Sequence, residues 1–439
     1  MVSAVDEVVD LVSTLIQFDT SNTGDPETTN GERDCAHWVA EKLEEVGYRT
    51  EYVEGGAPGR GNLVTRLAGS DPTRGALLIH GHLDVVPAEA ADWSVHPFSG
   101  AVEDGYVWGR GAVDMKNMVG MVIAVARYLK RENIVPPRDL VFAFVADEEA
   151  GSKHGAQWLV DHRPDLFDGV TEAIGEVGGF SLTIPRRDGG DRRLYLIETA
   201  EKSMSWMRLT SRGQPGHGSF THDHNAVTTV AKAVARLGEH EFPVVLTEPV
   251  TQLLAAISEE TGYGFEGEDL EGAIAKLGSI SRIIGATLRD TANPTMLQAG
   301  YKANVVPASA QAIIDCRILP GRRAAFEATV DELLGPHVTR EWITDLPTYE
   351  TTFDGELVEA MTAALSRADP DARPVPYMLS GGTDAKAFAR LGIRCFGFAP
   401  LRLPADLDFA ALFHGIDERV PISALEFGVE VLLDFVMHC

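Results

Sequence analysis

The sequence predicts an α/β fold: a mixed, mostly parallel sheet flanked by helices, with a smaller α+β domain inserted into it. Through residues 1–199, short apolar segments alternate with segments whose apolar residues recur at helical spacing, as expected for strands and helices of an α/β sheet. From about Thr199, helices and half-exposed strands follow one another without that alternation, and the first pattern resumes near residue 352. We therefore expect residues 1–199 and 352–439 to form one domain and residues 200–351 to form an insert.

Apolar periodicity and turn residues predict the individual elements. In the first domain, we expect helices at residues 4–18, 31–46, 116–130, 356–367 and 422–435 and one ending near 161, and strands at residues 50–53, 62–67, 76–81, 140–146, 172–175 and 394–398. In the insert, we expect strands at residues 203–211, 296–299, 312–319 and 340–343, and helices at residues 225–237, 250–260, 324–334 and within 270–288.

Composition and charge argue against several classes of partner. The 439 residues carry a formal net charge of −27, which argues against nucleic acid or an anionic membrane surface, because phosphate groups are bound by basic patches. No basic region precedes an apolar run at the N-terminus, and no run is long and apolar enough to cross a bilayer, so we expect no signal peptide and no membrane span. Scattered cysteines without CxxC spacing indicate reduced thiols in a cytoplasmic protein; they are Cys35, Cys316, Cys395 and Cys439.

The stretch Leu78–Pro87 is the clearest candidate for a functional site. An apolar run ends in His80, His82 and Asp84, and alternation along a strand directs these three side chains to the same face. A histidine followed two positions later by an aspartate is typical of a metal-binding imidazole held by a carboxylate. A hydrogen-bonded core histidine near a strand end is the alternative that this stretch alone leaves open.

Further carboxylates follow other predicted strands or lie in the loops between elements. Several carboxylates gathered around one crevice repel one another unless cations neutralise them, so the pattern favours a metal site. These residues are Asp84, Asp114, Glu148, Glu149 and Glu176.

Eight short motifs carry these residues and continue through the rest of the chain. In order they are Gly81-His82-Leu83-Asp84-Val85-Val86-Pro87, Gly109-Arg110-Gly111-Ala112-Val113-Asp114-Met115-Lys116, Asp147-Glu148-Glu149-Ala150-Gly151, Glu176-Val177-Gly178-Gly179, Gly216-His217-Gly218-Ser219, Asn304-Val305-Val306-Pro307, Gly382-Thr383-Asp384-Ala385 and His414-Gly415. Together and in this order they closely resemble the M20 family of metallopeptidases and amidohydrolases. That family includes aminoacylases, succinyl-diaminopimelate desuccinylases, acetylornithine deacetylases and glutamate carboxypeptidases. The resemblance implies a sheet of the zinc-exopeptidase type, with the insert as a lid or dimerisation domain.

The resemblance also implies two divalent metal ions, usually zinc, with cobalt or manganese as alternatives. Asp114 would bridge both ions; one ion would add His82 and Glu176, and the other Glu149 and His414. Asp84 would bond the second ring nitrogen of His82 and fix its tautomer. Family members carry a cis peptide after the bridging aspartate, so one is expected at Asp114–Met115.

Catalytic and substrate-binding roles follow from the same resemblance. Glu148 would be the general base, which takes a proton from the attacking water and returns it to the leaving amine. His217 would stabilise the oxyanion, and in dimeric members this histidine comes from the partner chain, so a homodimer through the lid is expected. Arg317 would bind a substrate carboxylate, with a strand-end ion pair as the alternative. Additional contacts to the substrate are expected from Asn304, Gly382 and Thr383.

Other polar and aromatic residues have structural interpretations. His80 is expected to pack on the strand face, and Arg110 and Asp384 to brace loops. Cys316 is interpreted as a packing residue, because no activating base is evident nearby. Surface or loop-packing positions are expected for Trp93, His96, Phe98, His222 and His224.

Three features bear on the substrate. The succinyl-diaminopimelate branch usually has asparagine four positions before the last metal histidine, where this chain has Ala410, which weakens a desuccinylase interpretation. Residues 247–293 make the lid longer than the compact carboxypeptidase type. Glu176, in place of aspartate, is more similar to the deacylases and aminoacylases.

We therefore expect hydrolysis of the amide bond of an N-acyl amino acid or small peptide that carries a free carboxylate. A dipeptidase or carboxypeptidase of the same family is the alternative. The intact Glu148 disfavours a metal-binding scaffold or receptor without catalysis, because binding alone needs no general base.

Overall fold

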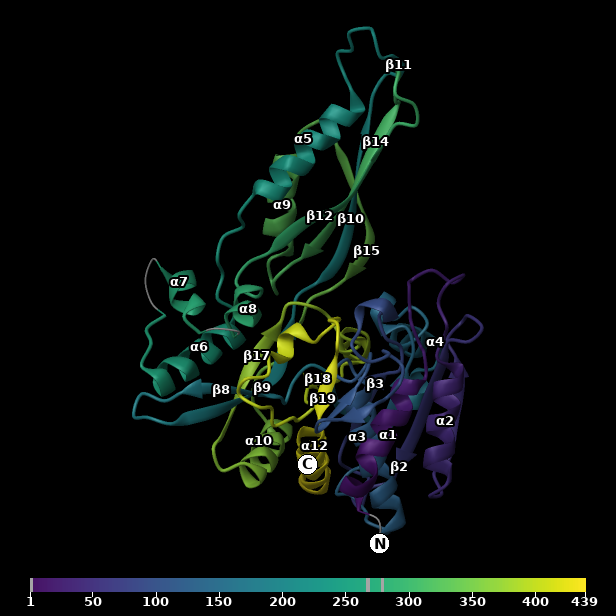
Figure 1. Cartoon of the computed structure of the whole chain (residues 1–439), viewed down its shortest axis with the longest axis vertical. Helices are drawn as coiled ribbons and strands as arrows, with labels where there is room; N and C mark the ends of the chain where they lie inside the picture. The colour runs from purple at the N-terminus through teal and green to yellow at the C-terminus, as the bar shows by residue number, and fades with distance from the viewer. Residues whose placement is uncertain (1–2, 266–268, 278–279) are drawn as a thin grey trace.

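The computed structural model describes residues 3–265, 269–277 and 280–439. A large sheet runs through the lower body of the molecule in Figure 1, and a smaller sheet rises from it. The strands of the large sheet are β1 (Thr50–Glu54), β2 (Gly61–Leu67), β3 (Ala76–His82), β6 (Leu140–Val145), β7 (Val170–Gly175), β8 (Ser181–Pro185), β9 (Asp191–Glu201), β16 (Tyr349–Glu350), β17 (Ala372–Leu379) and β18 (Arg394–Gly397). Their order is β1-β2-β6-β3-β7-β18-β9-β16, and β8 and β17 also pair with β9.

Four neighbouring strands at the centre of this sheet, β6, β3, β7 and β18, run parallel. Every residue of β3 and β6 is buried, as expected for parallel strands that helices cover on both faces. Because parallel strands end at the same edge of a sheet, the residues that follow β3, β6 and β7 lie near one another. This edge carries the candidate site.

Helices cover both faces of the large sheet. Leu77 and Ile79 of β3 pack in one hydrophobic cluster, and Leu78 packs in a second cluster on the opposite face. The first cluster includes residues of α1 (Ala4–Gln17), α2 (Arg33–Glu44), α3 (Lys116–Arg131), α10 (Glu356–Ala368) and α12 (Ile422–His438), and the second includes residues of α4 (Ala156–His162) and α11 (Ala385–Phe388). A reciprocal capping box between Ser3 and Asp6 begins α1.

The smaller sheet forms the lid. Its antiparallel strands, in the order β12-β14-β10-β15, are β12 (Thr291–Ala299), β14 (Ser309–Arg317), β10 (Met204–Arg212) and β15 (Thr339–Leu346). Helices α5 (Ala226–Glu239) and α9 (Arg323–Leu334) pack on it around a separate core that includes Leu209, Ile314 and Phe326. The short strands β11 (Gly216–His217) and β13 (Val305–Val306) pair at the far end of the lid (Figure 1).

Three helices lie within the sequence of the insert but belong to the core of the large sheet. They are α6 (Glu248–Thr261), α7 (Leu270–Ala275) and α8 (Ile280–Gly285). Leu253, Ile257 and Ile284 belong to the same core as Tyr377 of β17, and α6 lies against β17. Along these helices, the boundary between the core of the large sheet and the core of the lid therefore differs from the boundary expected from the sequence, which assigned residues 200–351 to the insert.

A third, small sheet joins two segments that are distant in sequence. It consists of β4 (Val102–Glu103), β5 (Tyr106–Trp108) and β19 (Arg419–Pro421), in the order β19-β5-β4. The antiparallel pairing of β5 with β19 places Trp108 opposite Arg419 and Val107 opposite Val420. It thereby brings the loop after β5 beside the loop before β19.

The expected helices and strands are confirmed with small differences at their ends, but among the described residues β8, β9, β17 and six short strands were not expected. The reason that β17 was not expected is clear: Pro374 and Pro376 argue against a strand when the sequence alone is considered. In the structure β17 pairs only with β9 among the described residues, so prolines are tolerated at the edge it leaves free.

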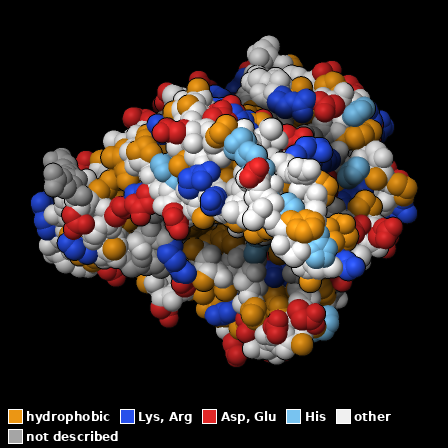
Figure 2. All heavy atoms as spheres, turned by 90° about the horizontal axis from the view of Figure 1, so that it is seen from above, with side chains coloured by type: hydrophobic (Ala, Val, Ile, Leu, Met, Phe, Trp, Pro, Cys, Tyr) orange, Lys and Arg blue, Asp and Glu red, His pale blue; other side chains and the backbone are white. Residues whose placement is uncertain are grey.

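Among the described residues, no helix has the length and apolar character needed to cross a membrane. Seen from above, the molecule shows acidic, basic, histidine and apolar side chains interspersed on one face (Figure 2).

Candidate metal centre

Five side chains from distant parts of the chain converge at the carboxyl edge of the parallel strands. His82 is the last residue of β3, Glu149 lies in a 3-10 turn (Glu148–Ala150) that closely follows β6, and Glu176 directly follows β7. Asp114 comes from the loop between β5 and α3, and His414 from the loop before β19. The expected cis peptide bond between Asp114 and Met115 is present.

These side chains form two groups that share Asp114. In the first group, Nε2 of His82 lies 3.1 Å from Oδ1 of Asp114 and 3.4 Å from Oε2 of Glu176. In the second group, Nε2 of His414 lies 3.2 Å from Oδ2 of Asp114 and 3.2 Å from Oε2 of Glu149. Within each group the possible ligand atoms all lie within 4.8 Å of one another, so each could hold a metal ion.

The donor set and its electrostatics fit a pair of divalent cations. Hydrogen bonds to Asp114 and Glu149 raise the pKa of His414 to about 10, which reflects the strongly negative potential of the site. Burial, together with the neighbouring charge of Asp114, raises the pKa of Glu176 to about 8. Oε1 of Glu149 is buried and has no hydrogen-bond partner within the described part of the chain. A buried carboxylate oxygen in a site of this potential is suited to a cation, because burying such charge unpaired is costly.

Asp84 orients His82 differently from the expected way. The backbone carbonyl of Asp84 lies 2.9 Å from Nδ1 of His82, whereas Oδ1 of its carboxylate lies 3.6 Å away. A proton on Nδ1 directed at the carbonyl leaves Nε2 free to face Asp114 and Glu176. The tautomer needed for metal binding is thus supported mainly by the backbone of Asp84, not by its carboxylate.

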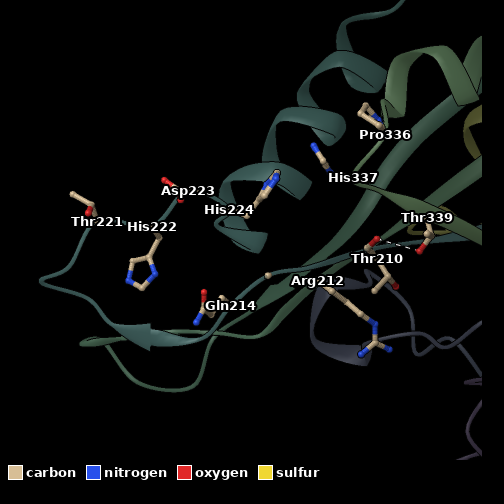
Figure 3. A pocket seen from close by; sticks show the side chains of 11 residues that line it. Thr210, Arg212, Gln214, Thr221, His222, Asp223, His224, Pro336, His337 and Thr339 are labelled. Atoms are coloured by element: carbon tan, nitrogen blue, oxygen red, sulfur yellow. Dashed lines mark hydrogen bonds between the residues drawn. The ribbon is translucent and has the colours of Figure 1, made fainter.

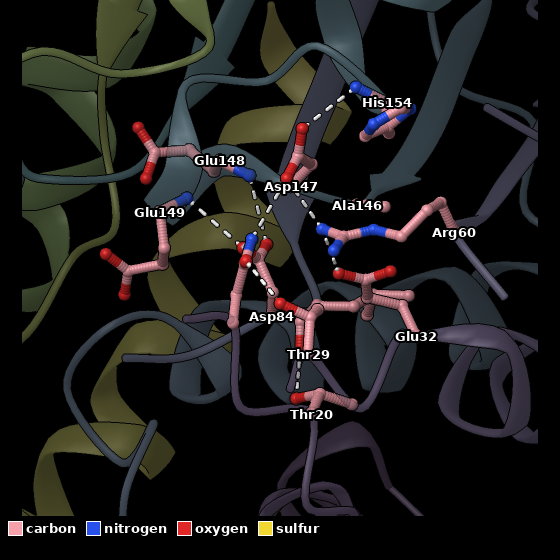
Figure 4. Close-up of polar contacts among 12 residues, drawn as sticks. Thr20, Thr29, Glu32, Arg60, Asp84, Ala146, Asp147, Glu148, Glu149 and His154 are labelled. Carbon is pink, nitrogen blue, oxygen red and sulfur yellow. Dashed lines mark hydrogen bonds and ion pairs between the residues drawn. The ribbon is translucent and has the colours of Figure 1, made fainter. Parts of the chain in front are cut away.

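The carboxylate of Asp84 instead holds the turn that carries Glu148 and Glu149. Its Oδ1 accepts the backbone N–H of Glu148 at 3.1 Å, and its Oδ2 accepts that of Glu149 at 3.2 Å. Oδ2 also accepts a hydrogen bond from the side chain of Asn22 at 2.8 Å. Figure 4 shows the bonds from the backbone of Glu148 and Glu149 to Asp84, with the carboxylates of Glu148 and Glu149 directed away from it.

A buried ion-pair network continues behind Asp84 (Figure 4). Asn22 also donates to Asp147, and Arg60 contacts both Asp147, at 2.7 Å, and Glu32, at 2.8 Å. Burial, followed by the charge of Asp84, raises the pKa of Glu32 to about 8. No role for Asn22, Glu32 or Arg60 could be predicted from the sequence, because their spacing along the chain is irregular.

Glu148 lies beside the two groups and lines a cavity of about 920 Å³ together with Asp114, Glu149, Glu176 and His414. Burial, followed by the neighbouring charge of Glu176, raises the pKa of Glu148 well above its ordinary value. A carboxyl with this environment and position can exchange protons with a ligand in the cavity.

Arg317 lines the same cavity from the lid side. Its Nε and Nη2 donate to the two carboxylate oxygens of Asp315, at 2.7 and 3.0 Å. The ion pair considered from sequence is therefore present, and it orients a guanidinium that also faces the cavity. Most of the remaining lining is apolar, including Phe180, Met204, Trp206, Ile283, Ala286, Tyr377, Met378, Leu379 and Phe413.

Gly382 and Thr383, both expected to contact the substrate, lie in different surroundings. Gly382 lines the cavity, with Ser380 and Gly381. Thr383 is buried, and its N–H and hydroxyl both donate to Glu201, at 3.0 and 2.5 Å, while Lys386 forms an ion pair with the same carboxylate. The hydroxyl of Thr383 is thus used inside the protein, which disfavours the expected contact with a substrate.

His217 lies in β11, at the end of the lid that is far from the large sheet (Figure 1), and Asn304 directly precedes β13, the strand that pairs with β11. The backbone carbonyl of Asn304 accepts the N–H of Gly218 at 2.9 Å. Nδ1 of His217 accepts the backbone N–H of Ser219 at 3.3 Å, so a neutral ring carries its proton on the exposed Nε2. His222, interpreted as a surface residue, contacts the carbonyl of His217 through Nε2 at 3.1 Å.

A second cavity, of about 680 Å³, lies at this end of the lid (Figure 3). Its lining includes Arg212, His222, His224 and His337, and the rings of His224 and His337 are 4.2 Å apart. These histidines belong to neither of the groups of metal-ligating side chains found among the described residues.

The residues with structural interpretations lie as follows. His80 packs against Phe388, with ring centroids 4.8 Å apart, and burial lowers its pKa to about 3. Asp384 bonds to Ser152, in the loop after Glu149, and the guanidinium of Arg110 lies over Trp93. The remaining positions agree with packing: His96 contacts Phe98, and burial raises the pKa of the Cys316 thiol.

Two buried charges near the cavity were also not found from the sequence. Lys202, between β9 and β10, lines the cavity, and its ammonium donates to the carbonyl of Arg289 at 2.5 Å. Glu418 is fully buried beside the loop that carries Asp114. The only signal for Glu418 is its place four residues after His414.

Comparison with known proteins gives the family. The family model described as "Peptidase family M20/M25/M40" matches residues 78–438. Among curated proteins, the chain is 29% identical to the probable carboxypeptidase S-like 2 of Dictyostelium discoideum, over 86% of this chain and 73% of the relative. It is 28% identical to the aminoacylase-1 of Sus scrofa, over 90% of this chain and 87% of the relative. It is 26% identical to the N-fatty-acyl-amino acid synthase/hydrolase PM20D1 of Mus musculus, over 85% of this chain and 76% of the relative.

Solved structures share the fold. The M20 family metallo-carboxypeptidase Sso-CP2 from Sulfolobus solfataricus superposes with a TM-score of 0.75 at 17% identity, covering 99% of both chains. Human carnosine dipeptidase 1 superposes with a TM-score of 0.67 at 19% identity, covering 99% of this chain and 97% of the other. Together with the family model, which spans most of the chain, these findings show that the chain belongs to the M20/M25/M40 family of peptidases.

Proposed function

We propose that the chain hydrolyses the amide bond of an N-acyl amino acid or small peptide that carries a free carboxylate. One observation carries this proposal: the two metal-ligand groups share Asp114 at the wall of a cavity that also holds Glu148 and Arg317. A scaffold that only binds metal would need neither a carboxyl of raised pKa beside the ions nor a guanidinium across the cavity.

Two zinc ions would be held by Asp114 as the shared ligand, with His82 and Glu176 on one and Glu149 and His414 on the other. Three carboxylates and two imidazoles suit catalytic zinc, and cobalt and manganese also accept this donor set. When bound, such ions polarise the scissile carbonyl and lower the pKa of water.

The side chains around the ions supply positioning and proton transfer. Glu148 would take a proton from the attacking water and return it to the nitrogen of the leaving amine. Its position is set by Asp84, which accepts the N–H of both Glu148 and Glu149. On the lid side, Arg317 would bind the substrate carboxylate through the part of its guanidinium that Asp315 leaves free, with Gly382 beside the ligand.

The apolar part of the cavity wall favours an apolar acyl group or side chain on the substrate. Two of the relatives are named for N-acyl amino acid chemistry, as an aminoacylase and as an N-fatty-acyl-amino acid synthase/hydrolase. A carboxypeptidase or dipeptidase activity is the second candidate, supported by the names of a relative and of two solved structures.

A substrate screen tests the proposed function. We expect chelator-sensitive hydrolysis of N-acyl amino acids or dipeptides and a strong preference for compounds with a free carboxylate over their amides. Arg317→Ala should lower kcat/KM for the free carboxylates by about 10–100-fold, since a hydrogen-bonded charge pair contributes about 1.5–3 kcal/mol. The same variant should barely affect the amides. An unchanged preference in Arg317→Ala would contradict this role, and the absence of hydrolysis for every class would contradict the function.

The place of His217 at the far end of the lid supports a site completed by a second subunit. We propose a homodimer in which the Nε2–H of His217 donates to the substrate carbonyl in the partner's cavity. Asn304 would act beside it, since its backbone already contacts the loop of His217.

Mixing two inactive variants tests this arrangement. A heterodimer of His217→Ala and Glu148→Gln subunits has one site with an intact Glu148 and an intact His217 from the partner. After exchange of subunits, the mixture should regain about a quarter of the wild-type activity, because half of the dimers are heterodimers with one active site each. No recovery, with exchange demonstrated, would mean that His217 does not act across the interface.

We further propose that residues 1–199 and 352–439 form the catalytic unit together with α6 to α8, and that the remaining insert forms the lid. Cytoplasmic location is the related proposal; it is supported by four cysteines that form no disulfide in the described chain.

A further inference from the structure

The loop that carries Asp114 is wrapped around the buried carboxylate of Glu418. Oε1 of Glu418 accepts three backbone N–H groups of this loop, from Gly111 at 3.1 Å, Val113 at 2.6 Å and Asp114 at 3.0 Å. Glu418 is fully buried, so these bonds are shielded from water. Successive N–H groups turned toward one anion form a concave anion site, here filled by a side chain of the same protein.

The other oxygen of Glu418 links this loop to the second histidine. Oε2 lies 2.7 Å from Nη1 of Arg110, whose side chain is buried, and Nη2 of Arg110 donates to the backbone carbonyl of His414 at 3.4 Å. His414 has a positive φ of 56°, a conformation that most residues avoid and that such a contact helps to hold. Arg110 and Glu418 therefore contact the backbone of both metal ligands that come from loops outside the large sheet.

The small third sheet sets this geometry. β5 leads directly into the loop of Asp114, and β19 begins directly after Glu418. Their antiparallel pairing continues into a hydrogen bond from the N–H of Gly109 to the carbonyl of Glu418, at 2.9 Å. In contrast, His82, Glu149 and Glu176 closely follow or end strands of the large sheet, and Asp84 contacts the His82 ring and the turn of Glu149.

We propose that Glu418 and Arg110 are positioning residues that pre-form the metal centre, and that they act most strongly on the ion held by Asp114, Glu149 and His414. This inference rests on the proposed function, because it assumes that both groups bind ions. Glu418 supports Asp114, which serves both ions, whereas Arg110 also supports His414, which serves only one. The two residues therefore have different expected effects.

Metal binding to the full chain tests the inference without any activity measurement. The two stepwise affinities for Zn²⁺ are measured by calorimetry with a competing chelator. Glu418→Gln should weaken the binding of both ions. The affinity for one of them should fall more, by about 10–100-fold, the usual effect of removing a partner of a metal ligand. Arg110→Lys should weaken the binding of this more affected ion alone, and it should be the ion whose binding His414→Ala abolishes.

Glu172→Gln is the matched control. Glu172 forms a partly buried ion pair with Arg138, also at 2.7 Å, in the first half of β7, away from the end of the strand that leads to Glu176. It should bind both ions as the wild type does, even if its thermal stability falls as far as that of Glu418→Gln.

Wild-type affinities for both ions in Glu418→Gln and Arg110→Lys would overturn the inference, and so would equal weakening in Glu172→Gln. If Glu418→Gln does not fold, Arg110→Lys alone decides. Failure of the proposed function can be told apart from failure of this inference by measuring the wild-type chain. If the proposed function is wrong, the wild-type chain binds fewer than two ions or hydrolyses no amide.

Discussion

Replacing Glu148 with glutamine is expected to lower kcat by about 10²–10⁴-fold, the usual contribution of a general acid–base group. The amide keeps the size of the side chain and leaves the backbone N–H that Asp84 accepts, so the turn and both metal sites should be retained. Steady-state kinetics together with metal analysis of the same preparation measures both parts of this expectation.

The neighbouring residue provides the control for this prediction. Glu149→Gln changes the same functional group one position further on, but Glu149 belongs to a metal-ligand group and Glu148 does not. We expect Glu149→Gln to lose affinity for one ion and Glu148→Gln to keep both. Full activity in Glu148→Gln would contradict its role as the base, and loss of metal from it would show a different role.

The pH profile gives a second readout for Glu148. A general base acts only when it is deprotonated, and burial and the charge of Glu176 raise the pKa of Glu148. Activity should therefore fall as the pH decreases through a pKa above the ordinary value for glutamate. The residual activity of Glu148→Gln should lack that acidic limb.

Replacing Asp114 with alanine is expected to remove metal binding and activity together, because both metal-ligand groups lose their shared member. Loss of the ions removes several kcal/mol of transition-state stabilisation, which corresponds to a factor of about 10³ or more in kcat. The variant should contain neither ion after dialysis, and added zinc should not restore hydrolysis.

His414→Ala is the comparison for Asp114→Ala. It removes a ligand from one group only and should leave the ion held by His82, Asp114 and Glu176. An Asp114→Ala variant that binds two ions as tightly as the wild type would contradict the assignment of Asp114 as the shared ligand.

The five side chains that converge at the edge of the large sheet could be predicted from the sequence, because strand ends and motif order locate them. His82, Glu149 and Glu176 closely follow or end apolar strands, and parallel strands bring such residues to one edge without further information. Asp114 lies in a loop and was grouped with Glu149 and Glu176 only as one of several carboxylates, whereas His414 was linked to the others only by the resemblance to the M20 family.

Other parts of the site depend on contacts that no short motif encodes. The carboxylate of Asp84 bonds the N–H groups of Glu148 and Glu149 and not the ring of His82, a difference set by how the turn after β6 folds back. Thr383 follows a glycine pair as a ligand-binding residue often does, yet its hydroxyl donates a hydrogen bond to the buried Glu201, which lies 182 residues away in the sequence. Glu418 lies 304 residues from Asp114, and the pairing of β5 with β19 brings them together.

Stepwise return of metal to the metal-free protein tests the central claim most directly. The chain is stripped with a chelator, Zn²⁺ is added in measured amounts, and bound metal and hydrolysis of an N-acyl amino acid are followed together. The arrangement of the two groups around Asp114 predicts that two ions bind per chain and that hydrolysis appears as they bind. Full hydrolysis by the metal-free protein, or a chain that binds no ion at these residues, would contradict it.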